Sequence, residues 1–119
     1  MTNFTTELIL NLLPALLLGF MGWITKRNPP KNINSTYGYR TRRAMQSEDA
    51  WDFANRMAPR VMLRAAAWLT VIALAVTLLL PLEAAQLVAY GSMIALMLMA
   101  VRKVDNALRN VFNDDGSRK

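Results

Sequence analysis

The side chains best suited to directed binding chemistry lie together in one polar stretch, residues 34–55. At its centre is an unbroken run of Tyr37, Gly38, Tyr39, Arg40 and Thr41. An arginine carries a planar fork of donors, which suits carboxylate, phosphate or carbonyl oxygens. A glycine between two tyrosines indicates a turn with a positive φ, which glycine adopts at low cost. The run therefore predicts a binding turn with Arg40 as its directed donor.

The sequence lacks the groups on which most catalytic and metal sites depend. It contains no cysteine and no histidine, so there is no thiolate, no imidazole base and no usual zinc ligand. We therefore predict no catalytic residue, no metal and no cofactor, and we expect no enzyme. An enzyme acting on lipid headgroups is the weakest class, because Arg40 could bind phosphate but no evident base accompanies it.

A short helix is predicted just after the run. Ser47 suits the N-cap position, and the acidic pair that follows it favours the positive end of the helix dipole. Trp51 and Asn55 are four residues apart, so they share one face. We expect this helix to span about residues 48–58 and to end before Pro59, which begins the next helix.

The residues alone leave two interpretations of this region open. In the first, the short helix lies in the membrane interface, with Trp51 at headgroup depth and Arg56 and Arg60 on lipid phosphates. In the second, the run at 37–41 folds onto the face of Trp51 and Asn55 and makes a structured cap. Only the second gives Arg40 a fixed direction.

Three apolar stretches must position this region. They cover residues 8–24, 65–82 and 84–101, and each approaches the roughly 20 residues that cross a hydrocarbon core. The last two are separated so narrowly that they must form an antiparallel hairpin. No charged side chain lies inside any span, which argues against a proton pump or ion-coupled carrier. The fold class is an all-α membrane protein with three transmembrane helices.

The basic residues predict its orientation. Of the 14 Lys and Arg residues, nine lie in residues 26–64 and five follow residue 101. Basic residues near a span resist translocation, so the N-terminus should be outside and the loop and C-terminus cytoplasmic. The formal net charge of +6 is explained by this orientation and by anionic lipid, so we expect no nucleic-acid partner.

The first apolar stretch is expected to remain as a transmembrane helix. No positive charge precedes it, and no small-residue cleavage pattern follows it. Pro14 withholds the donor that the Leu10 carbonyl would use, so this carbonyl needs another partner or the helix must bend. Asn11 either bonds another helix or lies high enough to meet water.

Beyond the last span, apolar residues continue at helical spacing to about Phe112, so the third helix should extend that far. Asp105 and Arg109 stand four apart and could pair weakly. Residues 113–119 are predicted to be a frayed, solvated tail. The chain is thus one membrane domain, residues 1–119, with a first helix at 1–27, a motif loop and short helix at 28–58, a hairpin at 59–112 and the tail.

The motif residues resemble those of a known family. Asn34, the run from Tyr37 to Thr41, Ser47, Trp51 and Asn55 are similar to the signature of the bacterial SdpI family, in which these residues precede a hydrophobic hairpin. The similarity extends over about residues 29–101. It implies that these nine positions form a partner- or lipid-binding cap. It also implies immunity against a membrane-active peptide, or membrane tethering of a cytosolic partner.

The sequence favours two functional classes. One is an integral membrane interaction protein of the bacterial cytoplasmic membrane, whose partners are lipids and either another protein or further copies of itself. The other is a structural or accessory subunit of a larger membrane complex, because three short helices bury little surface among themselves.

The distribution of basic residues generates a topological test. Reporter fusions or cysteine labelling should place Glu83 outside, and Arg42 and Lys119 inside, because the nine basic residues before residue 65 resist translocation. A cysteine at Gln46 should be protected from an impermeant reagent in intact cells. Labelling of that cysteine from outside would refute the orientation.

Overall fold

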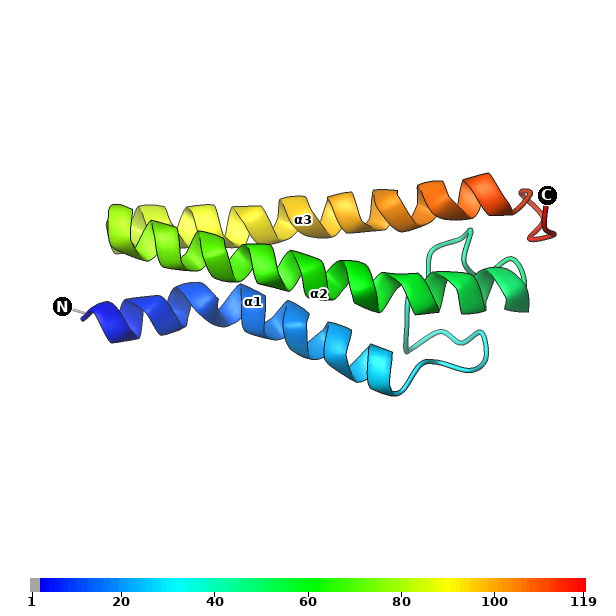
Figure 1. The fold of residues 1–119 in the computed structure, drawn as a ribbon, viewed down its shortest axis with the longest axis horizontal. Helices are drawn as coiled ribbons and strands as arrows, with labels where there is room; N and C mark the ends of the chain where they lie inside the picture. The colour runs from blue at the N-terminus through cyan, green and yellow to red at the C-terminus, as the bar shows by residue number, and fades with distance from the viewer. Residues whose placement is uncertain (1–2) are drawn as a thin grey trace.

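Three long helices make up most of the computed structural model, which describes residues 3–119 (Figure 1). Helix α1 covers Phe4–Arg27, α2 covers Glu48–Leu79 and α3 covers Leu82–Val111. All three are long and apolar enough to cross a membrane, so the predicted fold class is confirmed to that extent. Met1, which the charge count places outside the cell, lies outside the described residues.

The helices form an elongated bundle of 55 × 24 × 19 Å in which α2 packs against both other helices. The loop of residues 28–47 and the C-terminal residues lie at one end, which we call the cap end, and the α2–α3 turn lies at the other (Figure 1). Helices α1 and α3 make fewer contacts with each other, and α1 diverges from α3 toward the cap end. The predicted hairpin is confirmed.

The prediction of a separate short helix ending before Pro59 is wrong. Helix α2 begins at Glu48 as expected but continues through Pro59 to Leu79. Proline supplies no N–H for the Asn55 carbonyl, which normally disfavours a helix interior. The helix nevertheless remains continuous because one face of small side chains, Ala50, Ala54 and Ala58, packs against α3 just before the proline.

Continuity gives α2 more length than a membrane needs. Its 32 residues correspond to about 48 Å of helix, against a hydrocarbon core of about 30 Å. Its first turns, together with the last turns of α3, therefore extend beyond the apolar spans. These two extensions form the stalk on which the loop folds.

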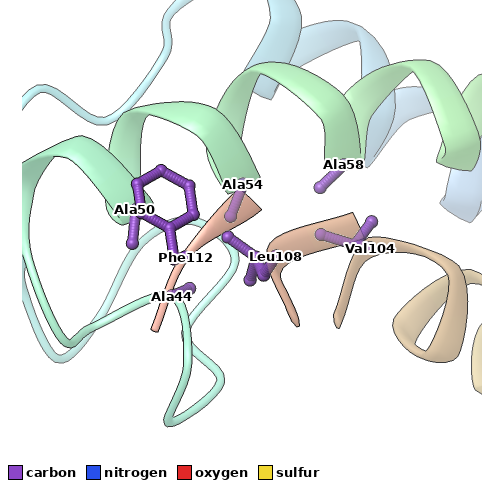
Figure 2. Close-up of a cluster of buried hydrophobic side chains, with 7 residues drawn as sticks. All are labelled: Ala44, Ala50, Ala54, Ala58, Val104, Leu108 and Phe112. Carbon is purple, nitrogen blue, oxygen red and sulfur yellow. The ribbon is translucent and has the colours of Figure 1, made fainter. Parts of the chain in front are cut away.

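Two buried clusters hold the bundle together. Near the middle, Ala15 and Leu18 of α1 meet Ala65, Ala66 and Leu69 of α2, an interface of small residues that lets the helices approach closely. At the cap end, Val104, Leu108 and Phe112 pack on the alanine face of α2 and on Ala44 of the loop (Figure 2). The second cluster fixes the stalk.

Polar groups inside the spans are shared between helices. Asn11 is buried and its Nδ2 donates to Thr77 Oγ1 at 2.9 Å, so it bonds a neighbouring helix rather than meeting water. The Leu10 carbonyl, which Pro14 leaves without a helical donor, accepts a long hydrogen bond of 3.5 Å from the Tyr90 hydroxyl. Both contacts bring the proline-containing part of α1 into register with the hairpin.

The packing of α1 on α2 generates a test with a matched control. A Cβ added at Gly22 would lie 3.1 Å from Leu63 Cγ, whereas one at Gly19 would lie at an ordinary 3.5 Å from Ala66 Cβ. Gly22→Ala should lower the free energy of unfolding in detergent by about 1 kcal/mol, because overpacking must separate the helices. Gly19→Ala should be neutral or stabilising. Equal effects of the two substitutions would contradict this interface.

Candidate functional site

The predicted turn is formed, and Gly38 is essential to its shape. Gly38 has φ +105°, in the region that favours glycine. A Cβ at this position would also lie 2.6 Å from both Asn55 Oδ1 and Pro30 Cγ. Any side chain here is therefore opposed both by the backbone conformation and by the closeness of α2.

Asn55 attaches the turn to α2. Its Oδ1 accepts from the Tyr39 backbone N–H at 2.6 Å, and its Nδ2 donates to the Tyr39 carbonyl at 3.2 Å. The same Nδ2 donates to the Trp51 carbonyl at 3.0 Å. One buried side-chain amide thus satisfies both backbone groups of a loop residue.

Trp51 is fully buried inside the protein, so its side chain is not presented to lipid headgroups as the interfacial interpretation requires. Its indole Nε1 donates to the Pro30 carbonyl at 3.0 Å, so it holds the beginning of the loop against α2. A tryptophan in this position contributes both a large apolar surface and one directed bond. The folded-turn interpretation therefore describes the region.

Asn34 and Tyr37 shape the approach to the turn. Asn34 Oδ1 accepts from the backbone N–H groups of Thr36 and Tyr37 at 3.0 and 2.7 Å, an arrangement typical of asparagine-stabilised turns. The Tyr37 hydroxyl donates to the Asn28 carbonyl just beyond α1. The loop is thereby tied to the end of the first helix as well.

Asp105 is the cap residue that the sequence did not reveal. Its Oδ1 accepts from the Tyr39 hydroxyl at 2.6 Å and from Thr41 Oγ1 at 2.9 Å, so α3 holds the opposite side of the turn. Within residues 3–119 its bonds go to the loop, not to Arg109 as the spacing suggested. The sequence did contain one signal for this role: Asp105 is the single carboxylate on the α3 extension, and it lies one helical turn past the apolar span.

The environment of Tyr39 keeps its hydroxyl protonated. Burial, the hydrogen bond to Asp105 and the charge of Asp105 all raise the pKa of the Tyr39 phenol well above its usual value. The phenol also lies 3.0 Å from the Val101 carbonyl. Tyr39 therefore remains a hydrogen-bond donor throughout the physiological pH range.

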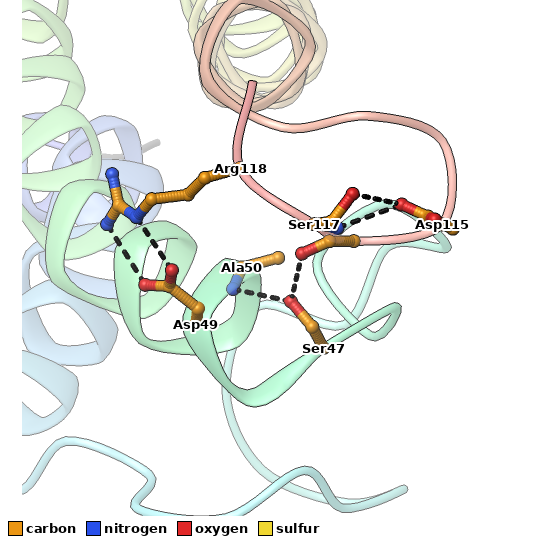
Figure 3. Close-up of polar contacts among 7 residues, drawn as sticks. Ser47, Asp49, Ala50, Asp115, Ser117 and Arg118 are labelled. Atoms are coloured by element: carbon orange, nitrogen blue, oxygen red, sulfur yellow. Dashed lines mark hydrogen bonds and ion pairs between the residues drawn. The ribbon is translucent and has the colours of Figure 1, made fainter.

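The C-terminal residues complete the cap, so the prediction of a frayed tail is wrong (Figure 3). Ser47 Oγ accepts from the Ala50 N–H at 3.0 Å, as an N-cap should, and donates to the Gly116 carbonyl at 2.7 Å. Arg118 forms a two-pronged ion pair with Asp49 at 2.6 and 3.0 Å. The tail folds back because Gly116, with φ +90°, permits the reversal.

These contacts also lower the pKa of exposed carboxyl groups. The Arg118 guanidinium holds the pKa of Asp49 below its usual range, chiefly through its hydrogen bonds. Hydrogen bonds from Ser117 lower the pKa of Asp115 in the same way. Both groups are exposed, so solvent screens their contribution to stability.

Arg40 differs from the other motif residues because it is exposed. Its guanidinium donates through one nitrogen to the Ser35 carbonyl, which directs it along the loop. The other eight predicted site residues form the cap itself through their contacts within the protein. They are Asn34, Tyr37, Gly38, Tyr39, Thr41, Ser47, Trp51 and Asn55. Among the nine predicted site residues, Arg40 is the one that the fold presents outward as a directed charge.

A cavity of about 370 Å³ lies beneath the turn, between the three helices. Its walls are mostly apolar, with contributions from Leu18 of α1, Met62 of α2 and Val104 of α3. Residues 38–41 and Asn55 form its polar side. The structure therefore gathers the centre of the motif at one cavity, whereas Asn34, Ser47 and Trp51 support it from outside.

Comparison with known proteins identifies a family whose match covers the loop and most of the hairpin. The model of the SdpI/YfhL protein family matches residues 31–102, which include the loop, α2 and the spanning part of α3. The chain is 47% identical over 47 residues to a Bacillus subtilis (strain 168) protein described as uncharacterized protein YfhL. That alignment covers 40% of this chain and 43% of the Bacillus protein. No solved structure matches the chain.

The contact between Tyr39 and Asp105 generates a test of the cap. Tyr39→Phe and Asp105→Ala should each lower stability by about 1 to 2 kcal/mol, because each removes a hydrogen bond to a charged group. The double variant should lose less stability than the sum of the two single losses, because the two side chains are partners in one contact. Hydrogen exchange of the amides at residues 37–41 should accelerate in all three proteins.

Arg109→Ala is the matched control, because it lies one helical turn from Asp105 and is exposed. Its effect should stay within about 0.5 kcal/mol. If Arg109→Ala accelerated exchange as much as Asp105→Ala, the carboxylate would be acting through Arg109 and not through the turn.

Proposed function

This chain belongs to the SdpI/YfhL protein family, and we propose that it is an integral membrane interaction protein whose cap is its recognition element. The observation that supports this most is the attachment of the turn on two sides, by Asn55 of α2 and by Asp105 of α3. A surface held in one conformation binds with a smaller entropic cost than a mobile loop. Recognition by a fixed Arg40 fork follows from that rigidity.

The family resemblance extends this proposal to immunity against a membrane-active peptide, acting in the cytoplasmic membrane of a bacterium with the cap facing the cytoplasm. The proposed orientation depends on the basic residues of the loop and stalk. Tethering of a cytosolic partner by the same cap uses the same geometry. In both cases the binding group is Arg40, and the remaining motif residues hold the turn that carries it.

A second candidate function, an accessory subunit of a larger membrane complex, is favoured by a different observation. The outward faces of α3 are strongly exposed, including Leu87 at 77%, Leu98 at 66% and Met99 at 64%. In a membrane such a face contacts either lipid or another protein, and small residues such as Gly91 beside it would permit close packing.

Substitution of Arg40 tests the fixed-site proposal. The protein is expressed in a sensitive bacterium, which is then challenged with culture supernatant of the strain that carries this gene. The wild-type protein should raise survival of these cells. Arg40→Lys should fail nearly as badly as Arg40→Ala, with at least about tenfold lower survival, because the point charge remains but the fork is lost. Arg42→Lys is the matched control and should protect fully.

The outcomes separate the alternatives at matched expression. Full protection by Arg40→Lys would refute a fixed fork and leave only net charge. Equal survival of wild-type and vector-only cells would refute immunity. In that case co-purification of one membrane protein at constant stoichiometry, lost when Leu98 is replaced by a bulkier tryptophan, would favour the accessory-subunit function.

A further inference from the structure

The cavity beneath the turn lies at the boundary between the apolar spans and the polar cap. The spans of α1 and α3 end at about residues 24 and 101, and the cavity is lined by Thr25 and Val101 at this level. Apolar walls continue from there into the spans, at Leu18 and Met97. The cavity is therefore polar on one side and apolar on the other, at the depth where the glycerol region of a lipid lies.

The mouth of the cavity opens sideways. Met21 of α1 is 48% exposed, and Met97 and Val101 of α3 are 41% and 42% exposed, and all three are lining residues. Two helices thus contribute to the mouth, α1 and α3, which make the fewest mutual contacts and diverge toward the cap end (Figure 1). In a membrane this opening faces the acyl chains, not the aqueous phase.

The charge at the cavity favours an anion. Among the described residues that line it, Arg40 alone is charged. Asp105 does not line this cavity; its Oδ1 accepts from the hydroxyls of the lining residues Tyr39 and Thr41, and it lines a separate recess with Arg42 and Arg43. The carboxylate is thus engaged by two hydroxyl groups, and Arg40 is left as the charged side chain of the cavity lining.

We propose that this cavity binds one anionic phospholipid, with an acyl chain between α1 and α3 and the phosphate on Arg40. A lipid matches every feature of the site: a lateral mouth, apolar walls, and a single planar donor group at headgroup depth. The proposal goes beyond the proposed function, and it uses Arg40 with a different readout, so either can fail alone.

The experiment measures lipid binding to the purified full chain. Delipidated protein in a mild non-ionic detergent is titrated with dioleoylphosphatidylglycerol or dioleoylphosphatidylcholine, and bound lipid is counted by native mass spectrometry. The wild-type protein should bind one phosphatidylglycerol about tenfold more tightly than phosphatidylcholine, as one charge-assisted contact allows. Glycerol 3-phosphate, the headgroup without chains, should not compete.

Two substitutions separate the charge from the cavity. Arg40→Gln should abolish the preference for phosphatidylglycerol, whereas Arg42→Gln, which removes the same charge from outside the cavity, should preserve it. Ala100→Phe should fill the cavity and weaken binding of both lipids about tenfold. If Ala100→Phe does not fold, Met97→Phe at the exposed rim replaces it.

Four results would overturn the lipid site. Equal binding of both lipids to the wild-type protein would show that the charge of Arg40 does not contribute to lipid selection. Equal losses in Arg40→Gln and Arg42→Gln would leave only diffuse attraction to an anionic surface. Competition by glycerol 3-phosphate, or unchanged binding in a folded filled variant, would show that the cavity holds no acyl chain.

Discussion

The rest of the cap depends on the amide of Asn55. A turn that packs against a helix needs partners for the backbone groups that it buries. Asn55 supplies an acceptor and a donor to Tyr39 at once, much as a neighbouring strand would. Asn55 lies four residues before Pro59, and α2 continues through that proline, so residues of the stalk and of the span belong to one helix. The conformation of the loop is thereby coupled to the position of the transmembrane helix.

Two different physical effects hold the two ends of the bundle. Within the spans, lipid is as apolar as leucine, so helix association depends on close packing and on hydrogen bonds such as Asn11 to Thr77. In the stalk, water is the alternative environment, and burial of Leu108 and Phe112 is favoured by the hydrophobic effect. The cap end therefore behaves as a small water-facing core placed on top of a membrane bundle.

The sequence predicts the parts of this structure that depend on local pattern. Apolar stretches specify the three helices, Ser47 marks the beginning of α2, and Gly38 marks the positive φ. It does not predict the parts that depend on distant contacts. Pro59 is a strong local signal for a helix boundary, and packing of the alanine face on α3 overrides it.

In the candidate site, too, local pattern could be predicted from the sequence and distant contacts could not. The residues at positions 37–41 are recognisable as a group, but their attachment to Asp105 joins positions more than sixty residues apart, for which no spacing rule exists. The polar C-terminal residues have the composition of a disordered tail, and contacts with distant residues such as Ser47, Asp49 and Arg43 order them. Local composition could not show which elements the bundle brings next to them.

The attachment of the turn to Asp105 also constrains the order of biogenesis. The loop is synthesised before α2 and α3, yet one of its attachments, the contact with Asp105, lies on the extension of α3, beyond the last span. During synthesis the loop can meet Asn55 early, but it cannot meet Asp105 until the hairpin has been inserted and its far extension has returned to the same side. The closed cap therefore forms only after the whole hairpin has been made and the extension of α3 lies beside the loop.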